Sequence, residues 1–64
     1  MSNADIKLCF RVIDLEVVKY KGFKDDGKFY LAEQVMQSKR GMERMLAALL
    51  GQPVEKLAEI RKLI

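Results

Sequence analysis

The stretch from Leu31 to Gly51 constrains the fold most, because its apolar residues recur at the spacing of an amphipathic helix. The stripe is interrupted once, at residues 37–41, where no large apolar side chain occurs. Ser38 can cap a following helix there, and Gly41 costs about 1 kcal/mol inside a helix relative to alanine. The pattern therefore predicts one short helix over residues 31–36, a turn near Ser38, and a second helix from Met42 to Leu50 that ends at Gly51.

Two short helices joined by a polar turn have the outline of a helix-turn-helix, a DNA-binding motif whose second helix enters the major groove. The run of residues 31–63, about half of the chain, resembles the helix-turn-helix of AraC-type regulators without a gap. The matching positions are Leu31-Ala32, Ser38, Met42, Arg44, Gly51 and Lys62-Leu63. The resemblance implies a DNA-binding unit in this half of the chain.

Residues 6–20 fit two periodicities about equally well. As a strand, apolar and polar side chains alternate from Ile6 to Val12 and, after a slip of one residue such as a β-bulge produces, from Ile13 to Val17. As a helix, one face carries Ile6, Cys9, Phe10, Ile13, Val17 and Tyr20. We favour the strand because the segment is rich in β-branched and aromatic residues, although its length suits a helix better.

The dipeptide Asp26-Gly27 supports the strand interpretation, because Asp-Gly is a strong signal for a two-residue hairpin loop. The sequence thus predicts an α+β fold in which an N-terminal β-hairpin, with one long strand, an Asp-Gly turn and one short strand, precedes two or three short helices. An all-α helix-turn-helix is the alternative. The last helix is expected to begin at Pro53, since proline is tolerated in a first helical turn.

Length and composition predict one small domain that self-associates. The 64 residues form a single domain, in which residues 1–4 have the character of a tag remnant or a disordered end. Half of the residues are hydrophobic, more than so small a body can bury, so we expect a homodimer. Met36, Met42 and Met45 either fill the core or line a groove for another protein.

Several function classes are excluded by what the chain lacks. It has no histidine and only Cys9 as a thiol, and its acidic residues are scattered except at Asp25-Asp26, which turn formation explains. We therefore expect a protein that is not an enzyme and that binds no metal or cofactor. No apolar run approaches the roughly 18 residues of a membrane span, and no signal peptide is recognisable, which predicts a cytoplasmic protein without a membrane partner.

Two functions are expected for this chain, which carries a formal net charge of +3. The first is a small, dimeric, DNA-binding transcriptional regulator, whose contacts with duplex DNA come from the predicted turn, the second helix and the hairpin. The residues expected to contact DNA are Ser38, Lys39, Arg40, Arg44, Lys24 and Lys28. The alternative is a dimeric protein-interaction module, such as a small phage- or plasmid-type adaptor or inhibitor. The apolar excess favours it, as does the lack of adenine-reading Asn and Gln over residues 38–50.

Overall fold

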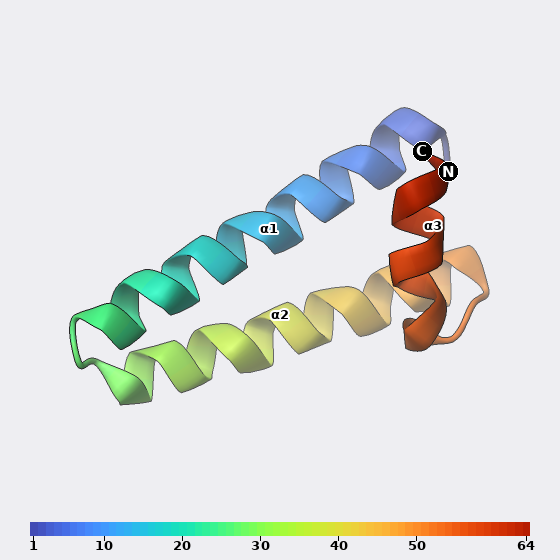
Figure 1. Cartoon of the computed structure of the whole chain (residues 1–64). Coiled ribbons are helices and arrows are strands. Elements are labelled where there is room, and N and C mark those ends of the chain that lie inside the picture. The colour runs from blue at the N-terminus through green and yellow to red at the C-terminus, as the bar shows by residue number, and fades with distance from the viewer.

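The protein is an all-helical hairpin in which a third, short helix covers one end. A computed structural model describes all 64 residues and contains α1 (Asn3–Asp25), α2 (Phe29–Leu50), the 3₁₀ turn η1 (Val54–Lys56) and α3 (Leu57–Leu63). The two long helices run antiparallel, and α3 packs across the end of the hairpin where both chain termini lie (Figure 1). The Asp-Gly turn closes the opposite end.

The predicted β-hairpin is wrong, because residues 6–20 lie wholly within α1 and the structure contains no strand. The face that the helical periodicity singled out is the one that faces the rest of the protein, with Ile6, Phe10 and Ile13 buried. Preference for a strand reflects packing on a pleated, half-buried surface. A lone hairpin offers too little of that surface, whereas α1 buries its apolar face directly against α2.

The ends of α1 follow local signals in the sequence. The Ser2 hydroxyl accepts a hydrogen bond from the backbone N–H of Asp5 at 3.2 Å, so Ser2 is the N-cap and the first residues belong to a capped helix. At the other end, Gly27 adopts a φ of +74°, a left-handed conformation that favours glycine. The Asp-Gly turn was thus predicted at the right place, but it joins two helices instead of two strands.

The turn predicted near Ser38 is also absent, because α2 continues without a break from Phe29 to Leu50. Apolar stripes on both sides of residues 37–41 share one helical register, and their packing outweighs the cost of one internal glycine. The predicted end of the helix is confirmed. Gly51 has a φ of +65°, and its N–H donates to the carbonyl oxygen of Ala48 at 3.1 Å.

The core lies in the half of the hairpin that α3 covers. It joins all three helices and consists of Ile6, Phe10, Ile13, Leu46, Ala47 and Leu57. Arg61 of α3 also reaches α1, where it donates a hydrogen bond to Asp14 and holds its guanidinium carbon 5.3 Å from the centroid of the Phe10 ring. The hydrogen bond to Asp14 raises the pKa of Arg61 above its ordinary value. One face of the hairpin is therefore covered by α3 at the end that holds the chain termini.

Candidate functional site

Helix α2 carries two parallel rows of residues, here called seams. Within each seam the residues are spaced alternately by four and by three, and one seam is shifted by one residue from the other. The inner seam of α2 consists of Ala32, Met36, Lys39, Glu43, Leu46 and Leu50. The outer seam of α2 consists of Leu31, Val35, Ser38, Met42, Met45 and Leu49. Ala32 and Leu46 of the inner seam are buried, whereas Met45 and Leu49 of the outer seam are 68% and 64% exposed. A helix with two such seams can pack against two neighbours, and here no further helix packs along the outer seam.

Helix α1 repeats this arrangement. Its inner seam faces α2 and consists of Ile6, Phe10, Ile13, Val17 and Tyr20. Its outer seam consists of Asp5, Leu8, Val12, Leu15 and Lys19. The three apolar residues in the middle of the outer seam lie at the surface, with Leu8 58%, Val12 42% and Leu15 56% exposed. Both long helices thus present a row in which large apolar side chains are exposed, although Val35 and Met42 of α2 are half-buried.

The two outer seams border an apolar groove with a volume of about 280 Å³. All eight residues that line it are hydrophobic: Leu8, Cys9, Val12, Ile13, Met42, Met45, Leu46 and Leu49. A separate hollow lies on the opposite face of the hairpin. It is lined by Leu57 and Arg61 of α3 together with Phe10 and Val17 of α1. Water in the apolar groove finds no side chain to hydrogen-bond, so an apolar partner that displaces it gains about 25 cal/mol per Å² of apolar surface buried.

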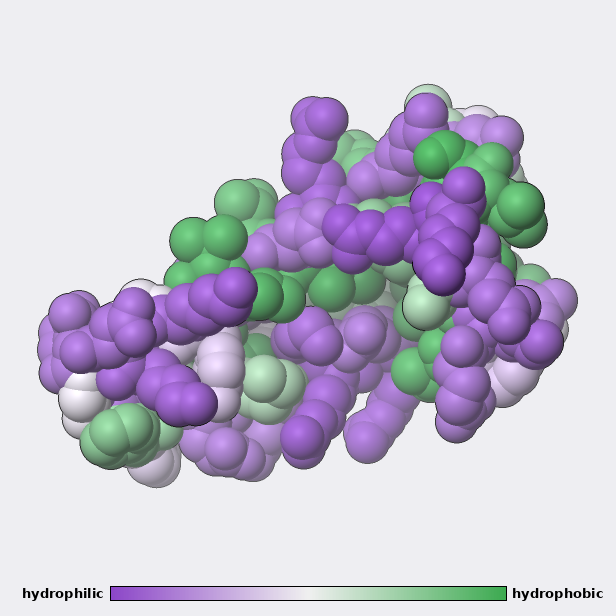
Figure 2. Space-filling view, viewed as in Figure 1, coloured by the Kyte–Doolittle hydropathy of each residue, from purple (hydrophilic) through white to green (hydrophobic).

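Many large hydrophobic side chains lie at the surface of the molecule. Only eight of the 64 residues are buried, which leaves most of the hydrophobic half of the chain in contact with solvent. From the side shown in Figure 2, hydrophobic surface interrupts the hydrophilic surface over the middle of α1 and again around α3. Apolar patches at the surface are typical of a protein that binds another protein.

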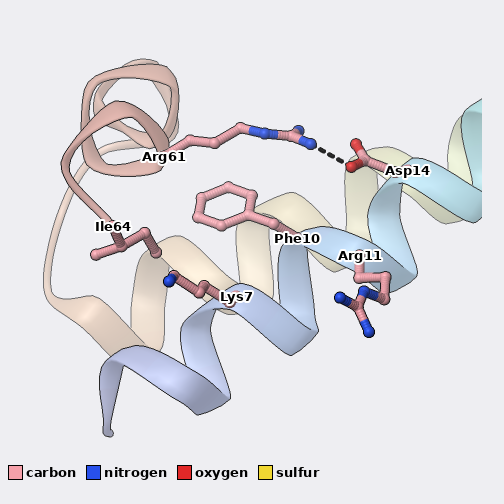
Figure 3. Close-up of a pocket in the computed structure, with 6 residues that line it drawn as sticks. All are labelled: Lys7, Phe10, Arg11, Asp14, Arg61 and Ile64. Carbon is pink, nitrogen blue, oxygen red and sulfur yellow. Dashed lines mark hydrogen bonds and ion pairs between the residues drawn. The ribbon is translucent and has the colours of Figure 1, made fainter.

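A second hollow, of about 290 Å³, lies between α1 and α3 (Figure 3). Its lining is mostly polar and consists of Lys7, Phe10, Arg11, Asp14, Arg61 and Ile64. Arg61 extends across the Phe10 ring toward Asp14, while Arg11 extends away from α3 (Figure 3). The carboxylate of Asp14 is thus already paired, and the cations do not converge on a common point. This hollow holds no arrangement of acid, base and nucleophile.

The residues predicted to contact DNA do not share one face. Lys39 lies in the inner seam and pairs with Glu43 at 3.2 Å, and Ser38 lies in the outer seam. Lys24 and Lys28 lie at the loop, where the Lys24 ammonium stands 5.7 Å from the centroid of the Tyr20 ring. Arg40 and Arg44 are exposed one turn apart on α2, and neither forms an ion pair. Of the predicted residues, Arg40 and Arg44 are thus the two exposed cations that lie one turn apart on a single helix.

The groove itself was missed in the sequence, although its signal was present. The register of residues 31, 35, 38, 42, 45 and 49 is a complete alternation of four and three, visible only if α2 is taken as one helix. Met42 and Met45 line the groove, whereas Met36 belongs to the inner seam and is half-buried.

Comparison with protein-family models, with curated proteins and with solved structures finds no match to this chain. No three His, Cys, Asp or Glu side chains come together in a way that could hold a metal ion. None of the helices combines the length and the apolar character needed to cross a bilayer. The apolar groove is the feature of the surface from which a function can be argued.

Proposed function

We propose that the protein is a non-enzymatic protein-interaction module that binds an apolar partner surface through the outer seams of α1 and α2. The groove between these seams supports the proposal most directly, because it is open to solvent and lined by hydrophobic side chains alone. Ligand sites for small polar molecules need precisely placed polar groups to orient them, and this groove offers none. A partner helix that lays its apolar side chains along the groove matches the hydrophobic lining of the groove.

The energetics favour a partner of this kind. Full burial of a Leu, Val or Met side chain contributes about 1.5–3 kcal/mol relative to full exposure. Five residues along the outer seams are between 42% and 68% exposed: Leu8, Val12, Leu15, Met45 and Leu49. Their burial would contribute on the order of 5 kcal/mol, a sizeable part of what protein association must offset in lost rotational and translational freedom.

Site-specific photo-crosslinking in cells tests this proposal. A benzophenone-bearing amino acid in place of Met45, which is 68% exposed on the groove, should form a discrete crosslink to a polypeptide. The same substitution at Gln37, which is exposed in α2 and lies in neither seam, is the matched control. A Met45 position that crosslinks no polypeptide, or that crosslinks the same ones as position 37, would contradict an interaction module acting through this groove.

Binding to duplex DNA is a second candidate, and the exposed pair Arg40 and Arg44 is the observation that favours it. Two unpaired guanidinium groups one turn apart can reach neighbouring phosphates. Replacing both by alanine should reduce the slope of log affinity against log salt by about two, near one counterion per lost contact. Alanine at Lys21 and Lys62, which removes the same charge elsewhere, is the control, and an equal effect of both pairs would reduce any binding to nonspecific attraction.

A further inference from the structure

The hairpin has two faces, and α3 covers only one of them. We infer that the open face is covered by a second copy of this chain, so that two hairpins stack through their outer seams into a four-helix bundle. The inference rests on the proposed function and names the partner of that same groove. Three observations carry it: the symmetry of the apolar patch, the charges at the ends of the outer seam of α1, and the area of exposed surface.

The apolar patch has matching ends. Val12 and Met45 line the groove from opposite helices. Leu8 precedes Val12 by four residues and Leu49 follows Met45 by four, so these two lie at one end of the patch. Leu15 and Met42 lie three residues from Val12 and Met45 in the other direction, so they lie at the opposite end.

Consider a twofold axis that runs across the hairpin, perpendicular to the helices, at the level of Val12 and Met45. Rotation about this axis places each apolar end of one subunit on the opposite apolar end of its partner, and the two ends are of similar size. Leu8 then meets Leu15 of the partner subunit, and Leu49 meets Met42 of the partner subunit. Facing helices are antiparallel in this arrangement, as in four-helix bundles built from hairpins. Because the interface is isologous, one surface patch satisfies both subunits and the assembly closes as a dimer.

The charges at the ends of the outer seam of α1 complement one another in the same arrangement. In the outer seam of α1, Asp5 is the position before Leu8 and Lys19 is the position after Leu15. Each of the two charged residues lies seven residues from Val12. Both residues are exposed, the Lys19 side chain by 60%. The Lys19 ammonium also pairs with Glu16 of its own helix at 3.2 Å, and its exposed side is left to meet a partner. Antiparallel pairing about Val12 places Asp5 opposite Lys19 of the partner subunit at both ends of the seam. A twofold axis parallel to the helices would instead place α1 on α2 of the partner subunit, and Asp5 would not meet Lys19.

The exposed area also exceeds that of an ordinary monomer of this mass. The chain exposes 4818 Å². A folded monomer of 7.4 kDa is expected to expose roughly 4,200 Å², so this chain carries an excess of roughly 600 Å². A stable interface of standard size buries about 800 Å² on each partner. Covering the outer seams would bring the exposed area of the chain close to that of an ordinary folded protein.

Sedimentation equilibrium of the purified full chain is the first test. The chain should sediment as a dimer at micromolar concentration, and Val12→Glu should make it a monomer, since the substitution brings two carboxylates together at the axis. Leu63→Glu is the control: Leu63 is 83% exposed on α3 and lies outside the groove, so the dimer should persist. A monomeric wild-type chain would overturn the inference, and a crosslink from Met45 to a different polypeptide would then leave the proposed function standing.

A charge exchange tests the arrangement independently of Val12. Asp5→Lys and Lys19→Glu should each weaken the dimer about tenfold, from two lost ion pairs and the repulsion that replaces them. The double variant D5K/K19E should dimerise more tightly than either single variant, although Lys19→Glu also breaks the pair of Lys19 with Glu16. Within one subunit the two residues lie fourteen positions apart on α1, about 21 Å along the helix, so they cannot compensate there. A double variant no tighter than the single ones would overturn antiparallel pairing about Val12.

Discussion

Arg61 donates a hydrogen bond to the carboxylate of Asp14 and thereby ties α3 to the middle of α1, on the face of the hairpin opposite the apolar groove. The same guanidinium packs over the Phe10 ring, so Arg61 makes two contacts and Asp14 makes one. Both side chains are about half exposed, which limits what their ion pair contributes. The pair orients α3 more than it stabilises the fold.

We expect Arg61→Ala to lower the free energy of unfolding by about 1 kcal/mol and Asp14→Ala by less, because Asp14→Ala leaves the contact of Arg61 with Phe10 in place. Urea denaturation of both variants at one fixed protein concentration measures the difference. High salt should narrow the gap between the wild-type chain and Asp14→Ala, since exposed ion pairs are screened. An Asp14 variant less stable than the Arg61 variant would show that the ion pair outweighs the contact with the ring.

Two glycines should respond in opposite directions to substitution. Gly51 ends α2 with a φ of +65°, so Gly51→Ala forces a side chain into a left-handed conformation and should cost about 1 kcal/mol. Gly41 lies inside α2 with open space around the position of a Cβ atom, so Gly41→Ala should add up to about 1 kcal/mol. Thermal melts that rank the two variants in the reverse order would be inconsistent with one continuous α2 ending at Gly51.

The errors of the sequence interpretation have one physical origin. Local sequence signals predict the backbone conformation correctly where a single residue decides it, as at Gly27 and Gly51, which both adopt positive φ. Secondary-structure propensity gives the wrong prediction where packing decides the conformation. The β-branched residues of α1 favour a strand only if a sheet exists to receive them, and Gly41 interrupts a helix only if nothing on either side holds it together.

The sequence interpretation did not predict the groove, for a related reason. As long as residues 31–36 and 42–50 are treated as separate helices, their apolar positions form two short stripes and no second seam is visible. Once α2 is continuous, Leu31 and Leu49 belong to one row, and that row lies at the surface. The expected excess of apolar surface came from composition alone, which requires no correct secondary structure.

The ion pair of Lys39 and Glu43 lies in the middle of the inner seam of α2, with both side chains about one quarter exposed. Charges at this depth lose hydration that their attraction recovers only in part. We expect the double variant K39M/E43L to be as stable as the wild-type chain or more stable by about 1 kcal/mol, while Glu43→Leu alone is less stable because it leaves Lys39 unpaired. A double-mutant cycle in urea measures this, and a double variant less stable than either single one would refute it.

Cys9 reports directly on whether the groove is covered, because it is the only cysteine in the chain, is half-buried, and lines the apolar groove. A bulky maleimide should react with Cys9 more slowly as the protein concentration rises, since only the dissociated chain admits the reagent. In Val12→Glu the rate should be independent of concentration, whereas in Leu63→Glu it should fall as in the wild-type chain. Reaction through global unfolding would slow with concentration only if folding itself required the dimer. Circular dichroism over the same concentrations separates the two, because a chain that stays helical while its thiol becomes protected has closed the groove without refolding.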